Sequence, residues 1–362
     1  MAGMIIPSNH IAIWALTATG ATLGQRIQAY FPGSRLFVGR QVGDTLDDVT
    51  RFEHLGDMLP QYFNGYAGHV FIMATGIVVR SVAHLLRHKT KDPAVVVLDE
   101  CGHHAISLLS GHLGGANALT RRIAENIGAR PVITTATDLQ NIPAIDLIAQ
   151  ERRLAIENPA AIRHVSMALL EGRSIALHDP YGCLAGALPD ECLWHSEFTT
   201  GPDISVDKPF RGTGVWVDDI RVDLPAGILI LRPASLFIGV GCNRNTPVAE
   251  IRALMNRVLD DSGLAPASVA GLASIDLKAD EQGLLELAET LARPLVFFSR
   301  DQLSMVPDIP SPSTVVEKHV GVKSVCEAAA ILASESGQLI VPKKTTPNVT
   351  IAIARKFFTS SA

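Results

Sequence analysis

The feature that most constrains the fold is a regular alternation of short apolar runs with helical patterns. Between residues 11 and 135, runs such as IAIWALT, RLFVG and HVFIMA alternate with amphipathic segments such as GATLGQRIQAYF and GIVVRSVAHLLRHK. Alternation of this kind is typical of an α/β domain with a largely parallel sheet. The run AVVVL, residues 94–98, is apolar at every position, as expected of a strand that is covered on both faces. The pattern therefore predicts a central strand there.

The alternation pauses near residue 138 and resumes near residue 234, which predicts three parts. The middle stretch contains two helical patterns, the strand SIALHD and then short strand candidates among Gly, Pro and Asp. From SLFIGVG onward, strands and helices alternate again as far as VTIAIA. We predict an α/β protein: two α/β domains with mostly parallel sheets, at residues 1–138 and 234–362, joined by a smaller middle module or connector at 139–233.

Composition restricts the partners and the compartment. The chain of 362 residues has a net charge of −5 and only 5% aromatic residues, so it offers neither a basic stripe nor a base-stacking platform, and we expect no nucleic-acid partner. No stretch approaches about 18 uninterrupted apolar residues, and the first residues lack a basic segment, so we expect neither a membrane span nor a signal peptide. The five cysteines form no C-x-x-C pair, and their odd number favours the cytoplasm over an oxidising compartment.

Residues 107–117, SLLSGHLGGAN, place polar side chains and glycines between a predicted strand, HAISLL, and a predicted helix, ANALTRRIAENIG. Gly128 is expected to end that helix as its C-cap. Gly114 and Gly115 fall at its first turn, where unpaired amides and the positive end of the helix dipole attract anions. The pattern therefore predicts an anion-binding helix start.

Polar loops at 74–76 (ATG), 98–100 (LDE), 108–112 (LLSGH) and 134–138 (TTATD) each follow a predicted strand. Ligands of open α/β sheets bind beyond the carboxyl ends of the strands, so these loops are expected to converge on one crevice. The alternative is structural, because acids at strand ends often only cap the next helix. The groups predicted to carry acid/base chemistry are His112, Glu100, Asp99 and Ser110, and those predicted to bind an anionic substrate are Thr75, Gly76, Arg80, Lys89, Gly114, Gly115, Asn117, Thr134 and Thr135.

Two more specific kinds of site, a serine nucleophile and a zinc site, fit the residues of this region less well. A nucleophilic Ser110 would need the strand-turn-helix pattern G-x-S-x-G, and LLSGH lacks the glycine before the serine. A zinc site made of His103, His104 and His112 would need adjacent strand residues to face the same way, and the spacing H-H-x7-H matches no known ligand pattern. We expect neither a resident metal nor a cofactor.

A second glycine-rich loop occurs in IGVGCNRNTPVAEIRALM, residues 238–255. We expect Thr246 to be the N-cap of the following helix, Pro247 to lie in its first turn, and Glu250 to reach back toward the cap. The loop amides, Gly241 and Arg244 are candidates for binding a carboxylate or phosphate. The alternative is a tight turn without a ligand, which is common in α/β proteins.

Taken together, these stretches resemble the cobalt-precorrin-5A hydrolase family of anaerobic cobalamin biosynthesis. GIVVRSVAHLL, DPAVVVLDE, ISLLSGHLGGAN and PVITTATD are similar to its amino-terminal signature, and IGVGCNRNTP, LASIDLKADEQGL and SVCEAAAILAS to its carboxy-terminal one. The resemblance covers the chain from about residue 66 in the same order. The chain departs from it at His103 and His104, where other residues are usual, and at Asn243, where a second basic residue is usual.

The resemblance implies a hydrolase that opens the ring A lactone of a cobalt-bound tetrapyrrole with water and releases acetaldehyde, giving cobalt-precorrin-5B. Under this hypothesis His112 activates water, Glu100 or Asp99 orients or protonates, and amides near Gly114 and Gly115 hold the oxyanion or a substrate carboxylate. The cobalt is carried by the substrate, and other enzymes of the corrin pathway are possible partners. One alternative is a non-catalytic carrier of tetrapyrrole intermediates. Another is a phosphate-binding α/β enzyme, although no P-loop lysine motif is present.

Overall fold

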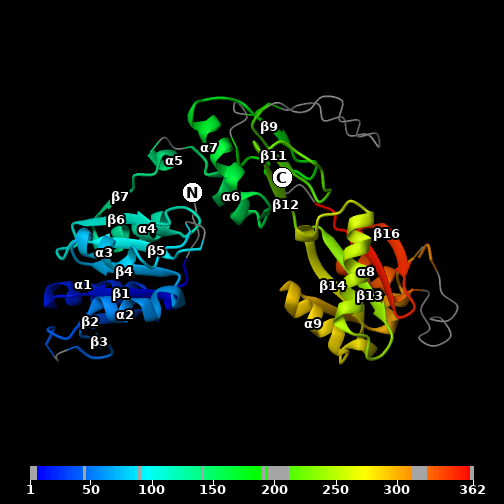
Figure 1. Ribbon diagram of the computed structural model, residues 1–362, viewed down its shortest axis with the longest axis horizontal. Coiled ribbons are helices and arrows are strands. Elements are labelled where there is room, and N and C mark those ends of the chain that lie inside the picture. Colours follow the sequence, from blue (N-terminus) through cyan, green and yellow to red (C-terminus); the bar gives the residue numbers. More distant parts are fainter. Residues whose placement is uncertain are drawn as a thin grey trace. The chain divides into compact units, whose positions relative to one another are not determined.

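The computed structural model describes residues 6–43, 46–88, 91–139, 142–188, 193–194, 212–307, 309–311 and 324–358. The chain divides into two compact units, Met1–Glu151 and Arg152–Ala362 (Figure 1). Both are mixed α/β structures with mostly parallel sheets, as the alternation predicts. The domain boundaries near residues 138 and 234 stay predictions. Within the described ranges, every helix is too short or too polar to cross a membrane.

The first unit is built on a seven-stranded sheet with the order β3-β2-β1-β4-β5-β6-β7. The run AVVVL forms β5, which is buried at all positions and lies inside the sheet, as predicted. Neighbouring strands are parallel except for β5 and β6. In sheet order the strands are β3 (Thr50–Phe52), β2 (Arg35–Gly39), β1 (Ile11–Ala15), β4 (Gly68–Ile72), β5 (Ala94–Leu98), β6 (His104–Leu109) and β7 (Arg130–Val132).

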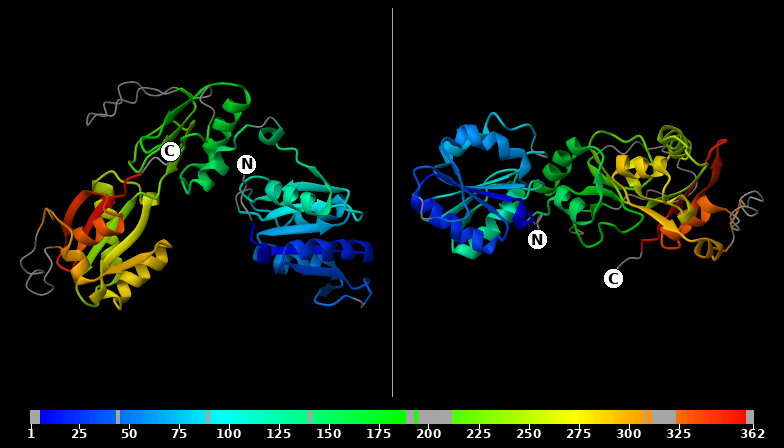
Figure 2. Two further views of the ribbon diagram at one scale, coloured as in Figure 1. Left: turned by 180° about the vertical axis from the view of Figure 1, so that it is seen from behind. Right: turned by 90° about the horizontal axis from the view of Figure 1, so that it is seen from below.

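Helices cover both faces of this sheet (Figure 2). On one face, Leu23 and Ile27 of α1 (Ala18–Tyr30) and Leu119 and Ile123 of α4 (Ala116–Ile127) pack in one apolar core with the strands. On the other face, α2 (Leu55–Tyr62) and α3 (Thr75–Val82) pack in a second core around Trp14. Gly128 has a φ of 76° and is the C-cap of α4, as predicted. Two further helices, α5 (Ala136–Leu139) and α6 (Ile145–Glu151), follow β7.

The connection between β5 and β6 reverses the chain direction. Val95 pairs with Leu109 and Leu98 pairs with Ala105, so the two strands are antiparallel. A parallel connection would need a crossover of about a dozen residues or more, and only residues 99–103 separate these strands. Because β6 is antiparallel to β5 and β7 is parallel to β6, the loops after β6 and β7 lie at the opposite end of the strands from the carboxyl ends of β4 and β5. The prediction that four loops converge on one crevice is therefore wrong.

The second unit contains two five-stranded sheets. In the first, only the pair β8 and β12 is antiparallel, and α7 (Ile162–Leu170) packs against it. In the second, β17 is antiparallel to both of its neighbours. The strands in sheet order are β10 (Leu193–Trp194), β9 (Ile175–His178), β11 (Gly214–Val217), β12 (Ile228–Arg232) and β8 (Ala155–Ile156), and then β15 (Leu295–Phe298), β14 (Val269–Ile275), β13 (Leu236–Cys242), β17 (Val349–Arg355) and β16 (Gln338–Thr345).

Helices also cover both faces of the last sheet. Apolar residues of α8 (Val248–Asp261) and α9 (Gln282–Leu291) share one core with β13 and β17. Side chains of α10 (Arg300–Ser304) and α12 (Val325–Ala333) share another core with β14. At Gly239 of β13, an added Cβ would lie 1.8 Å from the carbonyl oxygen of Cys326, so the glycine allows α12 to lie directly on the sheet. A buried ion pair between Arg355 and Asp219 ties β17 to the segment after β11.

Candidate active site

The loop between β6 and α4 has a backbone that depends on its glycines. Ser110 has a φ of 57°, and its carbonyl accepts a hydrogen bond from the amide of Ala116 at 3.1 Å. A Cβ on Gly114 would lie 2.3 Å from the Cβ of Ser110 and 2.8 Å from its carbonyl oxygen. Gly115, with a φ of 83°, is the N-cap of α4. Only glycine at position 114 lets the loop close on itself and present His112 beside the helix.

The amides at this helix start are already used within the loop. The N–H groups of Gly115, Ala116 and Asn117 donate to the carbonyls of His112, Ser110 and Gly111, at 2.8, 3.1 and 3.0 Å. An anion would have to compete with these internal bonds. The prediction that these three amides bind an anion is therefore corrected: their N–H groups bond within the loop and hold it together instead.

Side chains from three segments converge on the carboxylate of Asp138 in α5. Its Oδ2 accepts hydrogen bonds from Thr135 Oγ1 at 2.6 Å, Asn117 Nδ2 at 2.8 Å and His112 Nε2 at 3.0 Å. Its Oδ1 accepts from Arg121 Nη2 at 2.6 Å. Burial acts to raise the pKa of Asp138, but the hydrogen bonds from Thr135, Arg121 and His112 outweigh it and lower the pKa below its ordinary value. Asp138 is therefore an ionised anchor.

The ionised Asp138 determines which nitrogen of His112 carries the proton. A carboxylate only accepts hydrogen bonds, so Nε2 of His112 must be the donor in this contact. In the neutral ring, Nδ1 then keeps its lone pair and is the basic nitrogen. The Oδ2 of Asp146, in α6, lies 3.9 Å from Nδ1, and the side chains of His112 and Asp146 are 22% and 11% exposed. An imidazolium formed here would lie between two carboxylates.

The partners of His112 distinguish it from a structural core histidine in the same unit. His69 of β4 accepts a hydrogen bond from Trp14 Nε1 at 3.1 Å, and its Nε2 lies 3.0 Å from the carbonyl oxygen of Phe63. Burial lowers the pKa of His69 to about 4, so it stays neutral. His112 has carboxylate partners instead, which is the arrangement that an acid/base histidine requires.

Helix α4 presents the other polar groups of the site. Asn117 and Arg121 are four residues apart and therefore lie on the same side of the helix. Asn117 also donates to Thr135 Oγ1 at 2.9 Å and accepts from Ser107 Oγ at 2.6 Å. The hydroxyl that supports Asn117 thus comes from Ser107. The Arg121 side chain is 45% exposed, so it can contact an anion as well as Asp138.

Several predicted site residues lie at the opposite edge of the sheet. Asp99 and Glu100 follow β5, and α3 begins with Thr75 and Gly76, after β4. The carboxylate of Asp99 accepts the amides of Cys101, His103 and His104 and so shapes the β5–β6 turn. The predicted partnership of His112 with Asp99 or Glu100 is wrong because β6 is antiparallel to β5. The two acids precede β6 and His112 follows it, and this strand spans about 17 Å at about 3.4 Å per residue.

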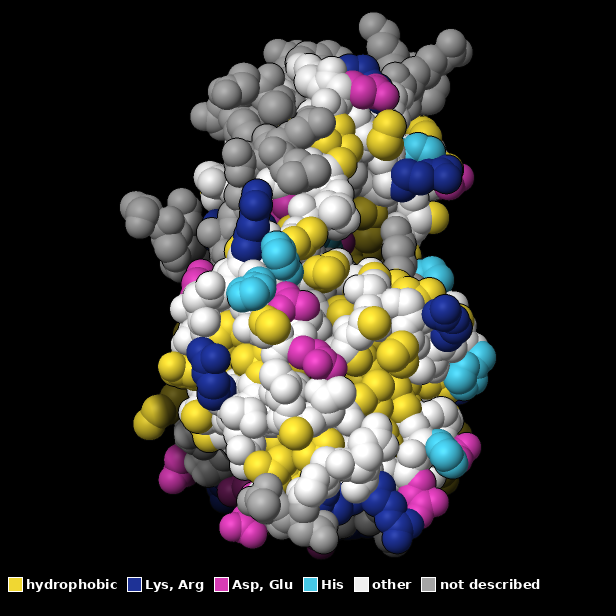
Figure 3. All heavy atoms as spheres, turned by 90° about the vertical axis from the view of Figure 1, so that its left-hand side faces the viewer, with side chains coloured by type: hydrophobic (Ala, Val, Ile, Leu, Met, Phe, Trp, Pro, Cys, Tyr) yellow, Lys and Arg dark blue, Asp and Glu magenta, His cyan; other side chains and the backbone are white. Residues whose placement is uncertain are grey.

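The remaining predicted residues of the first unit are Arg80, Thr134 and Lys89, and none of the described contacts of the Asp138 carboxylate comes from them. The guanidinium of Arg80 donates to the carbonyl of Gly76, one turn earlier in α3, at 2.8 Å. Thr134 is exposed beside Thr135, and Lys89 lies outside the described residues. On the face of the first unit shown in Figure 3, the coloured Lys and Arg side chains stand apart among acidic and apolar ones.

The second glycine-rich loop, between β13 and α8, is held by different contacts. Pro247, one residue later than predicted, is the N-cap of α8, and the Thr246 hydroxyl donates to the carbonyl of Asn243 at 2.8 Å. Glu250 accepts from Asn348 instead of reaching back to the cap. Arg244 contacts Asp280 and donates to the carbonyl of Leu277 at 2.7 Å. This loop has no histidine among its described contacts.

Gly241 lies in β13, just before this second loop and paired with Thr350 of β17, and an added Cβ there would lie 2.5 Å from the Thr350 hydroxyl. Burial raises the pKa of the neighbouring Cys242, so its thiol is not activated as a nucleophile. Arg244 and Thr246 lie in the loop that follows Gly241 and contact Asp280 and backbone carbonyls, and the binding of an anion by these residues stays a prediction.

Two carboxylates of the first site were not among the predicted site residues. Asp138 closes the quoted loop TTATD, so its place after a strand was a usable signal. Asp146 lies 34 positions after His112, and the contact depends on how α6 returns to the loop. No local pattern in the sequence indicates that contact.

Three family models together match most of the chain, from residue 57 to residue 354. Those described as cobalamin synthesis G N-terminal, cobalamin biosynthesis central region and cobalamin synthesis G C-terminus match residues 57–138, 143–233 and 236–354. The Asp138 cluster draws its His, Asn, Thr and Arg residues from the first of these matches.

Individual relatives are similar over most of their length. Over 367 residues, the chain is 36% identical to the cobalt-precorrin-5A hydrolase of Priestia megaterium, covering 97% of this chain and 96% of that protein. It is 33% identical to the cobalt-precorrin-5A hydrolase of Salmonella typhimurium, covering 96% and 98%. Among solved structures, CobE, a protein from the cobalamin (vitamin B12) biosynthetic pathway, is 39% identical over 33% of this chain and 90% of its own, with a TM-score of 0.32.

Proposed function

The chain belongs to the cobalt-precorrin-5A hydrolase family, and from that premise we propose that His112 and its carboxylate partners carry out the hydrolysis. The chain is a hydrolase of cobalamin biosynthesis that acts on a cobalt-containing tetrapyrrole. In the proposed reaction, water opens the ring A lactone of cobalt-precorrin-5A, and a two-carbon fragment leaves as acetaldehyde, which gives cobalt-precorrin-5B. The observation that carries the assignment of the site is the hydrogen bond between His112 Nε2 and Asp138 Oδ2 at 3.0 Å.

The proposed base is Nδ1 of His112. Asp138 holds the proton on Nε2, so Nδ1 can take a proton from water as its oxygen attacks the lactone carbonyl. The imidazolium that forms is stabilised by Asp138 on one side and by Asp146, 3.9 Å from Nδ1, on the other. The same imidazolium returns the proton to the oxygen that leaves when the lactone opens, which gives an alcohol and a carboxylate. Acetaldehyde release then needs the alcohol to give its proton back to the neutral His112 as its oxygen forms the C=O bond and the carbon–carbon bond to the ring breaks, and the electron pair left on the ring carbon takes up a proton.

Arg121 is the proposed contact for negative charge on the substrate. It is paired with Asp138 and 45% exposed, so its guanidinium can bind a carboxylate at the rim of the site. Asn117 and Thr135 keep the Asp138 carboxylate in place. The substrate carries many carboxylates, and the predicted residues Arg80, Lys89 and Arg244 stay proposed contacts for them.

The experiment that tests the function combines the purified chain with cobalt-precorrin-5A and measures acetaldehyde by its reduction with alcohol dehydrogenase and NADH. We expect one acetaldehyde per substrate together with loss of the lactone. A carrier would bind the substrate, change its absorption spectrum and release no acetaldehyde, and that result would overturn the proposal. Because relatives similar over nearly their full length are named hydrolases, the carrier alternative is not favoured.

Three further parts of the proposal rest on the sequence. We propose that the reaction needs no cofactor, since the only metal involved enters with the substrate. The odd cysteine count supports a cytoplasmic location. Other enzymes of the corrin pathway are proposed partners, because the product is the substrate of a later step.

A further inference from the structure

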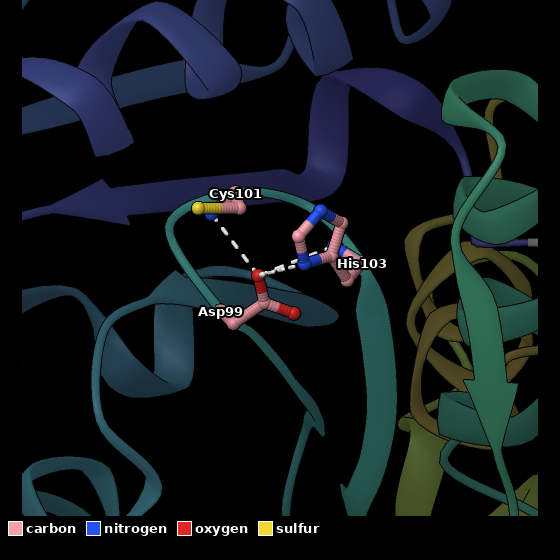
Figure 4. A group of neighbouring side chains, drawn as sticks. All are labelled: Asp99, Cys101 and His103. Carbon is pink, nitrogen blue, oxygen red and sulfur yellow. Dashed lines mark hydrogen bonds and ion pairs between the residues drawn. The ribbon is translucent and has the colours of Figure 1, made fainter.

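The β5–β6 turn brings together three side chains with different metal-binding atoms. A carboxylate oxygen of Asp99, the thiol sulfur of Cys101 and a ring nitrogen of His103 all lie within 4.8 Å of one another (Figure 4). All come from five consecutive residues, 99–103, of one tight turn. Cys101 and His103 are exposed, so an ion can reach the group from solvent.

A fourth possible donor stands beside the group. Nδ1 of His104 lies 3.5 Å from Asp99 Oδ2, and Nδ1 of His103 lies 4.0 Å from Asp99 Oδ1. Adjacent residues within a strand would face opposite ways, but β6 begins only at His104 and His103 still belongs to the turn. Both rings therefore approach the same carboxylate.

The Asp99 carboxylate is fixed in place and still has room for a cation. Its Oδ1 accepts the amides of Cys101 and His103 at 3.0 and 3.2 Å, and its Oδ2 accepts the amide of His104 at 2.6 Å. A carboxylate offers about four lone-pair positions, so about one remains, on the oxygen that faces His104. Burial acts to raise the pKa of Asp99, but these amides outweigh it and lower the pKa, so the group is ionised.

We propose that Asp99, Cys101 and His103, with His104 as a fourth ligand, form a binding site for a borderline-soft divalent cation such as Zn²⁺ or Co²⁺. Sulfur, imidazole nitrogen and a carboxylate oxygen together suit these ions, whereas Mg²⁺ and Ca²⁺ prefer oxygen ligands alone. Binding converts the Cys101 thiol to a thiolate and releases its proton to solvent. The antiparallel β6 places this site at the sheet edge away from His112, so it is separate from the proposed hydrolysis.

The test uses the full chain without an affinity tag, kept reduced and freed of metal, with Co²⁺ and Zn²⁺ as probes. We expect one Co²⁺ per chain, with a thiolate-to-cobalt charge-transfer band in the near ultraviolet that C101S abolishes. The matched control, C183S, removes another cysteine that is not fully buried and should keep the band. Zn²⁺ titrated into weakly buffered protein should release a proton, and C101S should not release it.

The histidine ligand is tested by affinity. Zn²⁺ binding to His103→Gln should weaken by at least about tenfold, whereas His54→Gln, which changes another exposed histidine, should bind as the parent chain does. Circular dichroism of each variant checks that it is folded. Absence of the cobalt band in the parent chain would overturn the proposal, as would a band that survives in C101S. Unchanged Zn²⁺ affinity in His103→Gln would overturn the assignment of the three-donor site.

Discussion

The loop between β6 and α4 and the loop between β13 and α8 look alike in sequence, yet they hold different groups. Both run from a strand to a helix, with Gly111, Gly114 and Gly115 inside the first loop and Gly239 and Gly241 in the strand that precedes the second. In the first, a histidine and two carboxylates meet where each side chain is largely buried. In the second, Arg244 and Asp280 pair while both are more than half exposed. Burial makes the first arrangement able to hold a charge in a defined place, whereas water screens the second.

The largest expected difference in activity and stability comes from substituting one glycine at each loop, Gly114 within the first and Gly241 in β13 just before the second. Gly114→Ala places a Cβ 2.3 Å from the Cβ of Ser110 and 2.8 Å from a backbone carbonyl, so the loop must open. We expect acetaldehyde release to fall below detection and the free energy of unfolding to fall by about 1–3 kcal/mol. In Gly241→Ala the added Cβ meets mainly the Thr350 hydroxyl, which can rotate away. This variant should keep most of its acetaldehyde release and most of its free energy of unfolding. Steady-state kinetics and urea unfolding measure the effects, and equal losses in the two variants would contradict the comparison.

The next effect concerns the acidic partner in each loop. Asp138→Asn removes the charge that holds the proton on His112 Nε2, so kcat should fall by about 10²-fold or more, with little change in substrate binding. Asp280→Asn removes one of the two acidic partners of Arg244, the other being Glu281 at 3.8 Å, and should leave kcat unchanged. Rapid-quench turnover and substrate titration separate the two quantities. A full kcat in Asp138→Asn would remove this residue from the mechanism.

The same pair of variants should differ in acid stability. Because the folded-state pKa of Asp138 lies below its ordinary value of 3.8, the ionised carboxylate stabilises the fold above that pH. This contribution is lost as the pH falls through the lowered pKa. The stability difference between the parent chain and Asp138→Asn should therefore shrink below about pH 4. Asp280→Asn should match the parent chain at every pH, because its ion pair is exposed. Urea unfolding curves from pH 7 to pH 3 provide the measurement.

The smallest expected effect is that of Arg244→Ala. Its side chain is 54% exposed and contacts Asp280, Glu281 and the carbonyl of Leu277. A substrate that contacts this loop should bind the variant less tightly. KM should rise by up to about tenfold, which corresponds to the loss of one exposed charge-assisted hydrogen bond, and kcat should stay unchanged. A loss in kcat would show that the second loop takes part in the chemistry and that the comparison is wrong.

The sequence indicates the elements well because their signals are local. The wholly apolar run that becomes β5, the periodic face of α4 and its Gly128 cap are all confirmed. The residues of β6 do not themselves indicate whether this strand runs parallel or antiparallel to β5. The short connection of residues 99–103 does carry that information, since a parallel crossover would not fit into it.

For the candidate site, the local sequence predicted His112 and Asn117, which both contact Asp138 in the structure, but it paired the histidine with Asp99 or Glu100 instead. Asp99 and Glu100 are close to His112 in sequence and lie at the other sheet edge, while Asp146 is distant in sequence and lies 3.9 Å away. The return of α6 to the loop is a tertiary contact, and side-chain pattern alone does not encode it.

The central claim is that Nδ1 of His112 is the base of the reaction. The most direct measurement is single-turnover acetaldehyde release from cobalt-precorrin-5A by His112→Ala, with and without added imidazole. The variant should bind the substrate as the parent chain does, release acetaldehyde about 10²- to 10⁴-fold more slowly, and regain part of the rate with imidazole. Release at close to the parent rate, without imidazole, would contradict the account.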